Sequence, residues 1–78
     1  MDLENKAVVS EDGIRYIVID YVEHKGRIFA YLQNSDDETD TKFVELIGDE
    51  MDDIVPEYFE GVVMPLFVEK FKGYQKEE

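Results

Sequence analysis

Apolar residues follow one pattern up to Gly48 and another after it. In the first part, runs rich in β-branched and aromatic residues alternate with short polar segments that contain glycine, which is typical of antiparallel strands joined by tight turns. Asp12 with Gly13, and Gly26 in the next polar segment, favour the backbone conformations that hairpin turns need. The pattern predicts an antiparallel meander with strands at about residues 7–9, 14–23, 28–33 and 42–47.

The C-terminal part of the chain has the spacing of a helix. Pro56 suits a first helical turn, and apolar residues then recur at intervals of three and four positions as far as Phe71. We predict a helix over about residues 57–72. Pro65 lies inside it. Because a proline there removes a hydrogen bond and clashes with the preceding turn, we expect a kink at Pro65 or a second helix that starts there.

These elements predict one small α+β domain over residues 1–78, with an antiparallel meander of three or four strands and a kinked C-terminal helix packed on one face. The apolar content of 44%, with five Tyr and five Phe, is enough for a packed core. The chain is therefore not expected to be a disordered acidic tail, although its charge is high.

The predicted helix carries more apolar surface than one contact needs. The stripe expected to pack on the sheet consists of Phe59, Val62, Val63 and Leu66. A second stripe, rotated around the helix axis, consists of Met64, Phe67, Val68 and Phe71. The strands also carry apolar residues on both faces, and one helix cannot cover both. Either the kink brings both stripes onto one face, or the second stripe binds a partner or a second copy of the chain.

The charge of the chain favours some partners and disfavours others. Twenty acidic residues stand against eight basic ones, which gives a formal net charge of −12. Phosphate backbones and anionic membrane surfaces would be repelled, so the expected partner is a basic protein, with no direct nucleic-acid or membrane contact.

Eight carboxylates are concentrated in two predicted connecting segments, a solvated loop at about residues 34–41 and an acidic connector after Gly48. They either keep a small domain soluble or form an anionic surface for a basic partner. These candidate partner-binding residues are Asp36, Asp37, Glu38, Asp40, Asp49, Glu50, Asp52 and Asp53.

The residues that usually perform catalysis are nearly absent, since the chain has no Cys, one His and two Ser. No nucleophile is paired with a base, so we expect no catalytic residues, no cofactor and no enzyme activity. An EF-hand-like frame fits Asn34, Asp36, Glu38, Asp40 and Glu45 at positions 1, 3, 5, 7 and 12. Thr39 replaces the glycine required at position 6 and the flanking segments are predicted strands, so no metal site is expected.

Two further expectations concern the cellular location of the protein and the environment of Asp20. The first six residues lack the basic start and apolar run of a signal peptide, and no segment approaches the roughly 20 apolar residues of a membrane span, so a cytoplasmic protein is expected. Asp20 lies within an apolar strand, and we expect it on the solvated face or hydrogen-bonded to Tyr or Arg.

The order of elements resembles that of the YrzB-like family of small acidic bacterial proteins of unknown function. The resemblance rests on Asp12 and Gly13, the Gly26 turn, a strand with Tyr31 and Leu32, and the acidic segments before the C-terminal helix, over roughly residues 12–72. Gly61 and Pro65 depart from the acidic, uninterrupted helix of that family. The resemblance implies the same fold and brings no established activity.

Together these features predict a non-enzymatic acidic protein-binding module. Its more specific form is an inhibitor that mimics nucleic acid and occupies the basic site of a nucleic-acid-binding protein, as phage-borne anti-CRISPR and anti-restriction proteins do. The alternative is a small homodimeric structural protein that buries its second apolar stripe on itself, with acidity serving only solubility.

Overall fold

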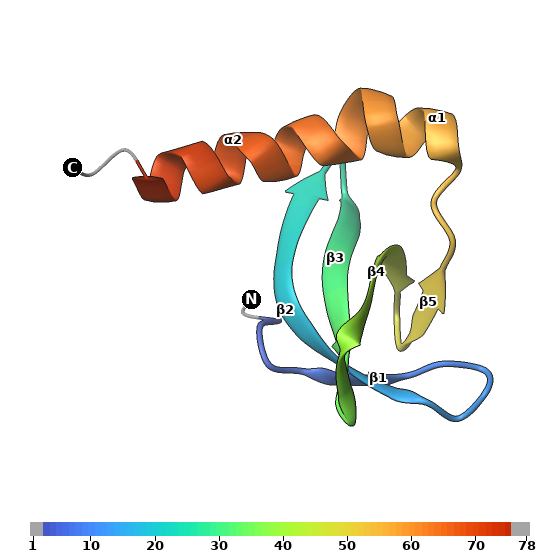
Figure 1. The fold of residues 1–78 in the computed structure, drawn as a ribbon. Helices are drawn as coiled ribbons and strands as arrows, with labels where there is room; N and C mark the ends of the chain where they lie inside the picture. The colour runs from blue at the N-terminus through green and yellow to red at the C-terminus, as the bar shows by residue number, and fades with distance from the viewer. Residues whose placement is uncertain (1–2, 76–78) are drawn as a thin grey trace.

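Figure 1 shows the computed structural model, which describes residues 3–75. Five strands precede one continuous helical segment, and each strand pairs antiparallel with the next in the order β1-β2-β3-β4-β5. The strands are β1 (Ala7–Val9), β2 (Arg15–His24), β3 (Arg27–Asn34), β4 (Asp37–Ile47) and β5 (Glu50–Asp52). The helical segment comprises α1 (Pro56–Tyr58), a π-helical turn η1 (Phe59–Val63) and α2 (Met64–Gln75). The predicted α+β class and the meander are confirmed.

The hairpin between β2 and β3 shows how local chemistry determines the turns. His24 pairs with Arg27, which leaves Lys25 and Gly26 as a two-residue turn. Both have positive φ, 53° and 80°, as a type I′ turn requires. Gly13 occupies the same left-handed region in the β1–β2 turn, with φ of 84°. The turns predicted at these glycines are therefore where the sequence places them.

The two acidic segments predicted as connections are largely strand, so this part of the prediction is wrong. Asn34 pairs with Asp37, and β4 begins there instead of near residue 42. Ser35 and Asp36 form the turn, which is closed by a 2.7 Å hydrogen bond from the Asp36 backbone N–H to Asn34 Oδ1. The connector after Gly48 contains β5. Neither acidic segment has the alternation of apolar residues on which a strand prediction depends.

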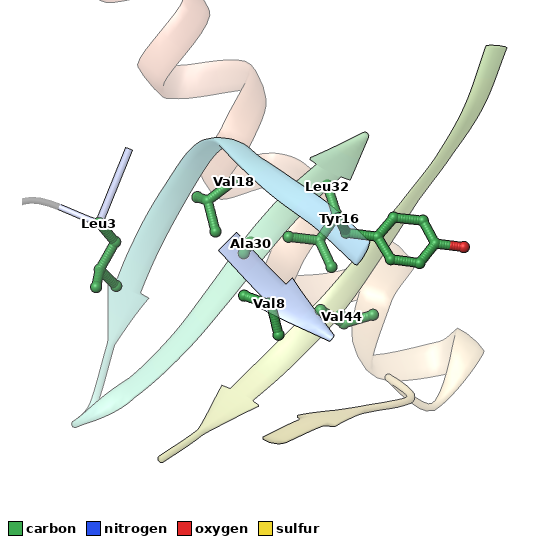
Figure 2. Close-up of a cluster of buried hydrophobic side chains, with 7 residues drawn as sticks. All are labelled: Leu3, Val8, Tyr16, Val18, Ala30, Leu32 and Val44. Atoms are coloured by element: carbon green, nitrogen blue, oxygen red, sulfur yellow. The ribbon is translucent and has the colours of Figure 1, made fainter. Parts of the chain in front are cut away.

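The strongly curved sheet buries its inner face on itself. β1 and β5, at opposite ends of the strand order, come into contact across the open side. The resulting inner core is shown in Figure 2 and consists of Leu3, Val8, Tyr16, Val18, Ala30, Leu32 and Val44. The curvature therefore covers the sheet face that the helix cannot reach, without a partner or a second copy of the chain.

The helical segment covers the outer face of the sheet through an aromatic layer. Phe29, Val63 and Phe67 are buried there. Phe43 lies at the centre of the layer, with its ring centroid 4.8 Å from that of Tyr31 and 5.1 Å from that of Phe67. Phe59 packs against Phe43 at 5.0 Å. Rings at these separations attract beyond their hydrophobic burial, by about 0.5–1.5 kcal/mol per pair.

Pro65 follows a π-helical turn within one continuous helical segment. The Met64 backbone N–H donates to the Phe59 carbonyl, a bond that spans five residues where an α-helix spans four. The wider turn precedes Pro65, where an α-helical carbonyl would clash with the prolyl ring. The helix therefore continues through Pro65 to Gln75.

The π-helical turn also determines which residues face the sheet. In a regular α-helix, residues four apart drift by about 40° around the axis. A π-helical turn rotates less per residue, so Phe59, Val63 and Phe67 stay on one line against the sheet. Phe67 of the second stripe is only 4% exposed, so it packs on the sheet and is not a partner-binding residue, whereas Val62 and Leu66 of the first stripe are only half-buried.

A bulge in β2 changes the faces on which its residues lie. Val18 pairs with Leu32 and Asp20 with Tyr31, so Ile19 has no partner across the ladder. Val18 belongs to the inner core. An extra residue reverses the alternation of a strand, and Asp20 is therefore turned to the outer face, beside the helix.

Asp20 forms an ion pair with Lys70 of α2. The Lys70 Nζ lies 2.5 Å from Asp20 Oδ1 and 2.6 Å from the Tyr21 carbonyl oxygen, and the Tyr21 backbone N–H donates to Asp20 Oδ1 at 2.8 Å. Asp20 is 7% exposed, so the expectation of a solvated position is wrong, and its side-chain partner is a lysine instead of Tyr or Arg. A nearly buried carboxylate requires such partners because its desolvation is costly.

The helix register predicts contrasting effects for two phenylalanines of α2. Phe67→Ala removes a buried ring from the aromatic layer and should lower the free energy of unfolding by about 3–5 kcal/mol. Phe71 is 51% exposed, so Phe71→Ala should change the free energy of unfolding by less than about 1 kcal/mol. Urea denaturation followed by circular dichroism measures both, and equal losses would contradict the register.

Candidate partner-binding surfaces

The eight acidic candidate residues form two groups at opposite ends of β4. The hairpin carboxylates, around the β3–β4 turn, are Asp36, Asp37, Glu38 and Asp40. The connector carboxylates, in the β4–β5 hairpin and just after it, are Asp49, Glu50, Asp52 and Asp53. At about 3.3 Å per residue, β4 is on the order of 30 Å long, so the structure does not bring the two groups together.

Two of the four hairpin carboxylates, Asp37 and Asp40, accept hydrogen bonds from nearby residues of the sheet. Asp40 Oδ2 accepts hydrogen bonds from the Tyr16 hydroxyl at 3.0 Å and from Asn34 Nδ2 at 3.1 Å. Asp37 Oδ1 accepts from the Thr39 hydroxyl at 2.7 Å and from the Thr39 backbone N–H at 3.0 Å, and these bonds lower the pKa of Asp37. These two carboxylates therefore have a structural role that a partner would have to share.

The connector carboxylates are exposed and weakly engaged. Asp49 lies 3.9 Å from Lys6 Nζ, but its side chain is 98% exposed, and an ion pair in solvent contributes little. Asp52 lies directly opposite Glu45 in the β4–β5 ladder, where like charges repel. This end of the sheet therefore keeps its negative charge available at the surface.

A groove separates this end of the sheet from α1, and we call it the β5–α1 groove. It has a volume of about 630 Å³. Asp52, Asp53 and Glu57 contribute carboxylates to its lining, and the apolar lining consists of Ile54, Val55, Tyr58 and Val62. Val55 immediately precedes α1, and its apolar side chain is 62% exposed. The groove therefore combines negative charge with accessible apolar surface.

Arg27 and Glu45 complete the lining of the groove. Arg27 Nε donates to Glu45 Oε2 at 3.0 Å and Nη2 donates to Oε1 at 2.9 Å, a bidentate pair. The guanidinium carbon lies 4.7 Å from the centre of the Tyr58 ring and 5.2 Å from that of Phe29. The hydrogen bonds from Arg27 lower the pKa of Glu45, and those bonds in turn raise the pKa of Arg27.

The charges of Arg27 and Glu45 cancel, so the net charge of the groove comes from the other three carboxylates. Asp52, Asp53 and Glu57 have no ion pair with a cation in the part of the chain that the structure describes. They leave the groove with a formal net charge of about −3 at neutral pH.

The apolar candidate residues divide between the core and the surface. Met64, Val68 and Phe71 are 48%, 45% and 51% exposed and form the outer stripe of α2. Phe67 packs inward and is not accessible. Figure 1 shows that the C-terminal end of α2 extends past the strands.

Sequence patterns identified part of the groove and missed the rest. Asp52 and Asp53 are among the predicted residues, whereas Arg27, Glu45 and Tyr58 are not. These three come from β3, β4 and α1, and only the strand register and the helix position bring them together. Glu57 had a signal of its own, because an acidic residue after Pro56 suits the first turn of a helix.

Two searches of the described residues address metals and membranes. Within residues 3–75, no group of three or more His, Cys, Asp or Glu is arranged to hold a metal ion. Glu45, the last position of the EF-hand-like frame, is occupied by its pair with Arg27. No helix among these residues is both long and apolar enough to cross a membrane.

Comparison with known protein families, with curated proteins and with solved structures finds no match to this chain. No relative therefore assigns a role to the groove or to the outer stripe.

The Arg27–Glu45 pair predicts a pH dependence of stability. Because folding lowers the pKa of Glu45 below its ordinary value of 4.5, its stabilising contribution is complete above about pH 4.5 and is lost as pH falls through the folded-state pKa. In urea titrations from pH 6 to 3, the difference in free energy of unfolding between wild type and Glu45→Gln should therefore shrink as pH falls. Glu38→Gln removes the same charge from an exposed position of β4 and should not reproduce this trend. A pH-independent difference for Glu45→Gln would contradict the role of the pair.

Proposed function

We propose that this chain is a non-enzymatic protein-binding module whose partner is a basic protein. The observation that supports the proposal best is the position of the connector carboxylates, which are exposed beside a groove with accessible apolar surface. Charge alone would serve solubility equally well. Negative charge beside apolar surface in a concave site is what recognition of a basic polypeptide requires.

The net charge of −12 determines how such a partner would associate. It would steer a basic protein toward the chain and accelerate encounter, and this attraction weakens as salt increases. In its more specific form, the proposal is an inhibitor that occupies a basic nucleic-acid site, with carboxylates in place of phosphates. All of the hairpin and connector carboxylates except Asp53 belong to residues on a strand or a hairpin turn. This supports the mimic, because a mimic must present its charges from a defined backbone.

A second candidate function is self-association through the outer stripe of α2. The exposure of Met64, Val68 and Phe71 along one side of a helix favours it. Two observations weaken it. The inner face of the sheet is already covered by the curvature of the sheet, and Phe67 is withdrawn from the stripe into the aromatic layer.

Affinity capture from lysate of the source cell tests the proposal, with the tagged protein compared with a charge-reversed variant. The variant carries Asp36→Lys, Asp37→Lys, Asp52→Lys and Asp53→Lys. A basic protein should be retained by wild type at low salt, released at high salt and not captured by the variant. Circular dichroism of the variant shows whether it is folded. If Asp37→Lys opens the hairpin, reversal of Asp52 and Asp53 alone is the comparison.

Other outcomes of the capture distinguish the candidates. A partner that resists high salt and is lost on Phe71→Ala would place binding on the outer stripe and contradict the charge-based proposal. Capture of the chain alone would favour the homodimer, and a mass that stays dimeric on dilution in light scattering would establish it.

A further inference from the structure

We propose that the β5–α1 groove is a subsite for one lysine or arginine side chain of a basic partner. This inference rests on the proposed function and specifies where the partner is recognised. A long basic side chain has an apolar stem and a charged end. The groove has both complements, because Ile54, Val55 and Val62 line it beside the carboxylates of Asp52, Asp53 and Glu57.

Arg27 shows that this environment already holds a guanidinium group. Its side chain is bound by Glu45 in bidentate geometry and lies against the ring of Tyr58, which also lines the groove. Carboxylate pairing and contact with an aromatic face are the two interactions by which proteins recognise arginine. The chain's own arginine uses one carboxylate of the groove, and three remain for a second cation.

The hairpin carboxylates do not offer the same site. Asp37 and Asp40 are engaged by Thr39, Tyr16 and Asn34. The depression that Asp36 lines also includes the cation of Arg15. A basic side chain would meet the like charge of Arg15 there, with Asp36 as the single lining carboxylate.

Binding of a nona-arginine peptide, measured by isothermal titration calorimetry at low salt, tests the inference with two matched triple variants. The groove variant is Asp52→Asn, Asp53→Asn and Glu57→Gln. The control variant is Glu11→Gln, Glu23→Gln and Glu69→Gln, which removes three negative charges from exposed positions that are neither in the groove nor among the candidate partner-binding residues. Both variants have the same net charge, so any attraction due to net charge alone falls equally in both.

The groove variant should bind the peptide about tenfold more weakly than wild type, and the control variant less than about threefold more weakly, since a tenfold change is about 1.4 kcal/mol. Equal losses in the two variants would overturn the subsite and leave the basic-partner proposal standing, because diffuse attraction would then explain binding. Absence of wild-type binding at low salt would overturn both. Circular dichroism of each variant confirms that a loss is not due to unfolding, and Val55→Asn supplies a second test, because it should weaken binding without any change in charge.

Discussion

The sheet must bury apolar residues on two faces, while residues 3–75 supply one helical segment to cover them. The bulge at Ile19 allows β2 to serve both faces. Up to Val18, β2 contributes to the inner core. After the bulge its alternation is reversed, and Asp20 comes to the outer face within reach of Lys70. Bulges also bend a strand and increase its twist, which favours the curvature that brings β1 toward β5. The bulge in β2 therefore contributes both to the inner core and to the packing of the helix on the outer face.

The helix meets a second constraint through its π-helical turn. Pro65 would interrupt a regular α-helix, yet the aromatic layer needs a continuous line of contacts from Phe59 to Phe67. The turn of Phe59–Val63 satisfies both requirements before the proline is reached. Tyr58, the last residue of α1, precedes this turn and lies against Arg27, and the groove is lined by residues of both the helix and the end of the sheet. The candidate site therefore depends on the position of the helix against the sheet.

Features encoded by local chemistry could be predicted from the sequence, and features that depend on register could not. Gly13 and Gly26 indicated their turns, and the central parts of four strands followed from β-branched and aromatic runs. β5 and the first half of β4 lack apolar alternation, so pairing with a neighbouring strand decides their conformation. The partner of Asp20 depended on a bulge without a sequence signature, and the Arg27–Glu45 pair depended on the alignment of β3 with β4.

A double-mutant cycle shows whether the bulge turns Asp20 toward the helix. Asp20→Asn, Lys70→Met and the double variant would be compared by urea denaturation, with Asp20→Asn combined with Lys72→Met as the control pair. We expect a coupling energy of about 0.5–3 kcal/mol between Asp20 and Lys70, and additivity between Asp20 and the exposed Lys72. Additive effects of Asp20 and Lys70 would contradict the position of Asp20 on the outer face beside α2.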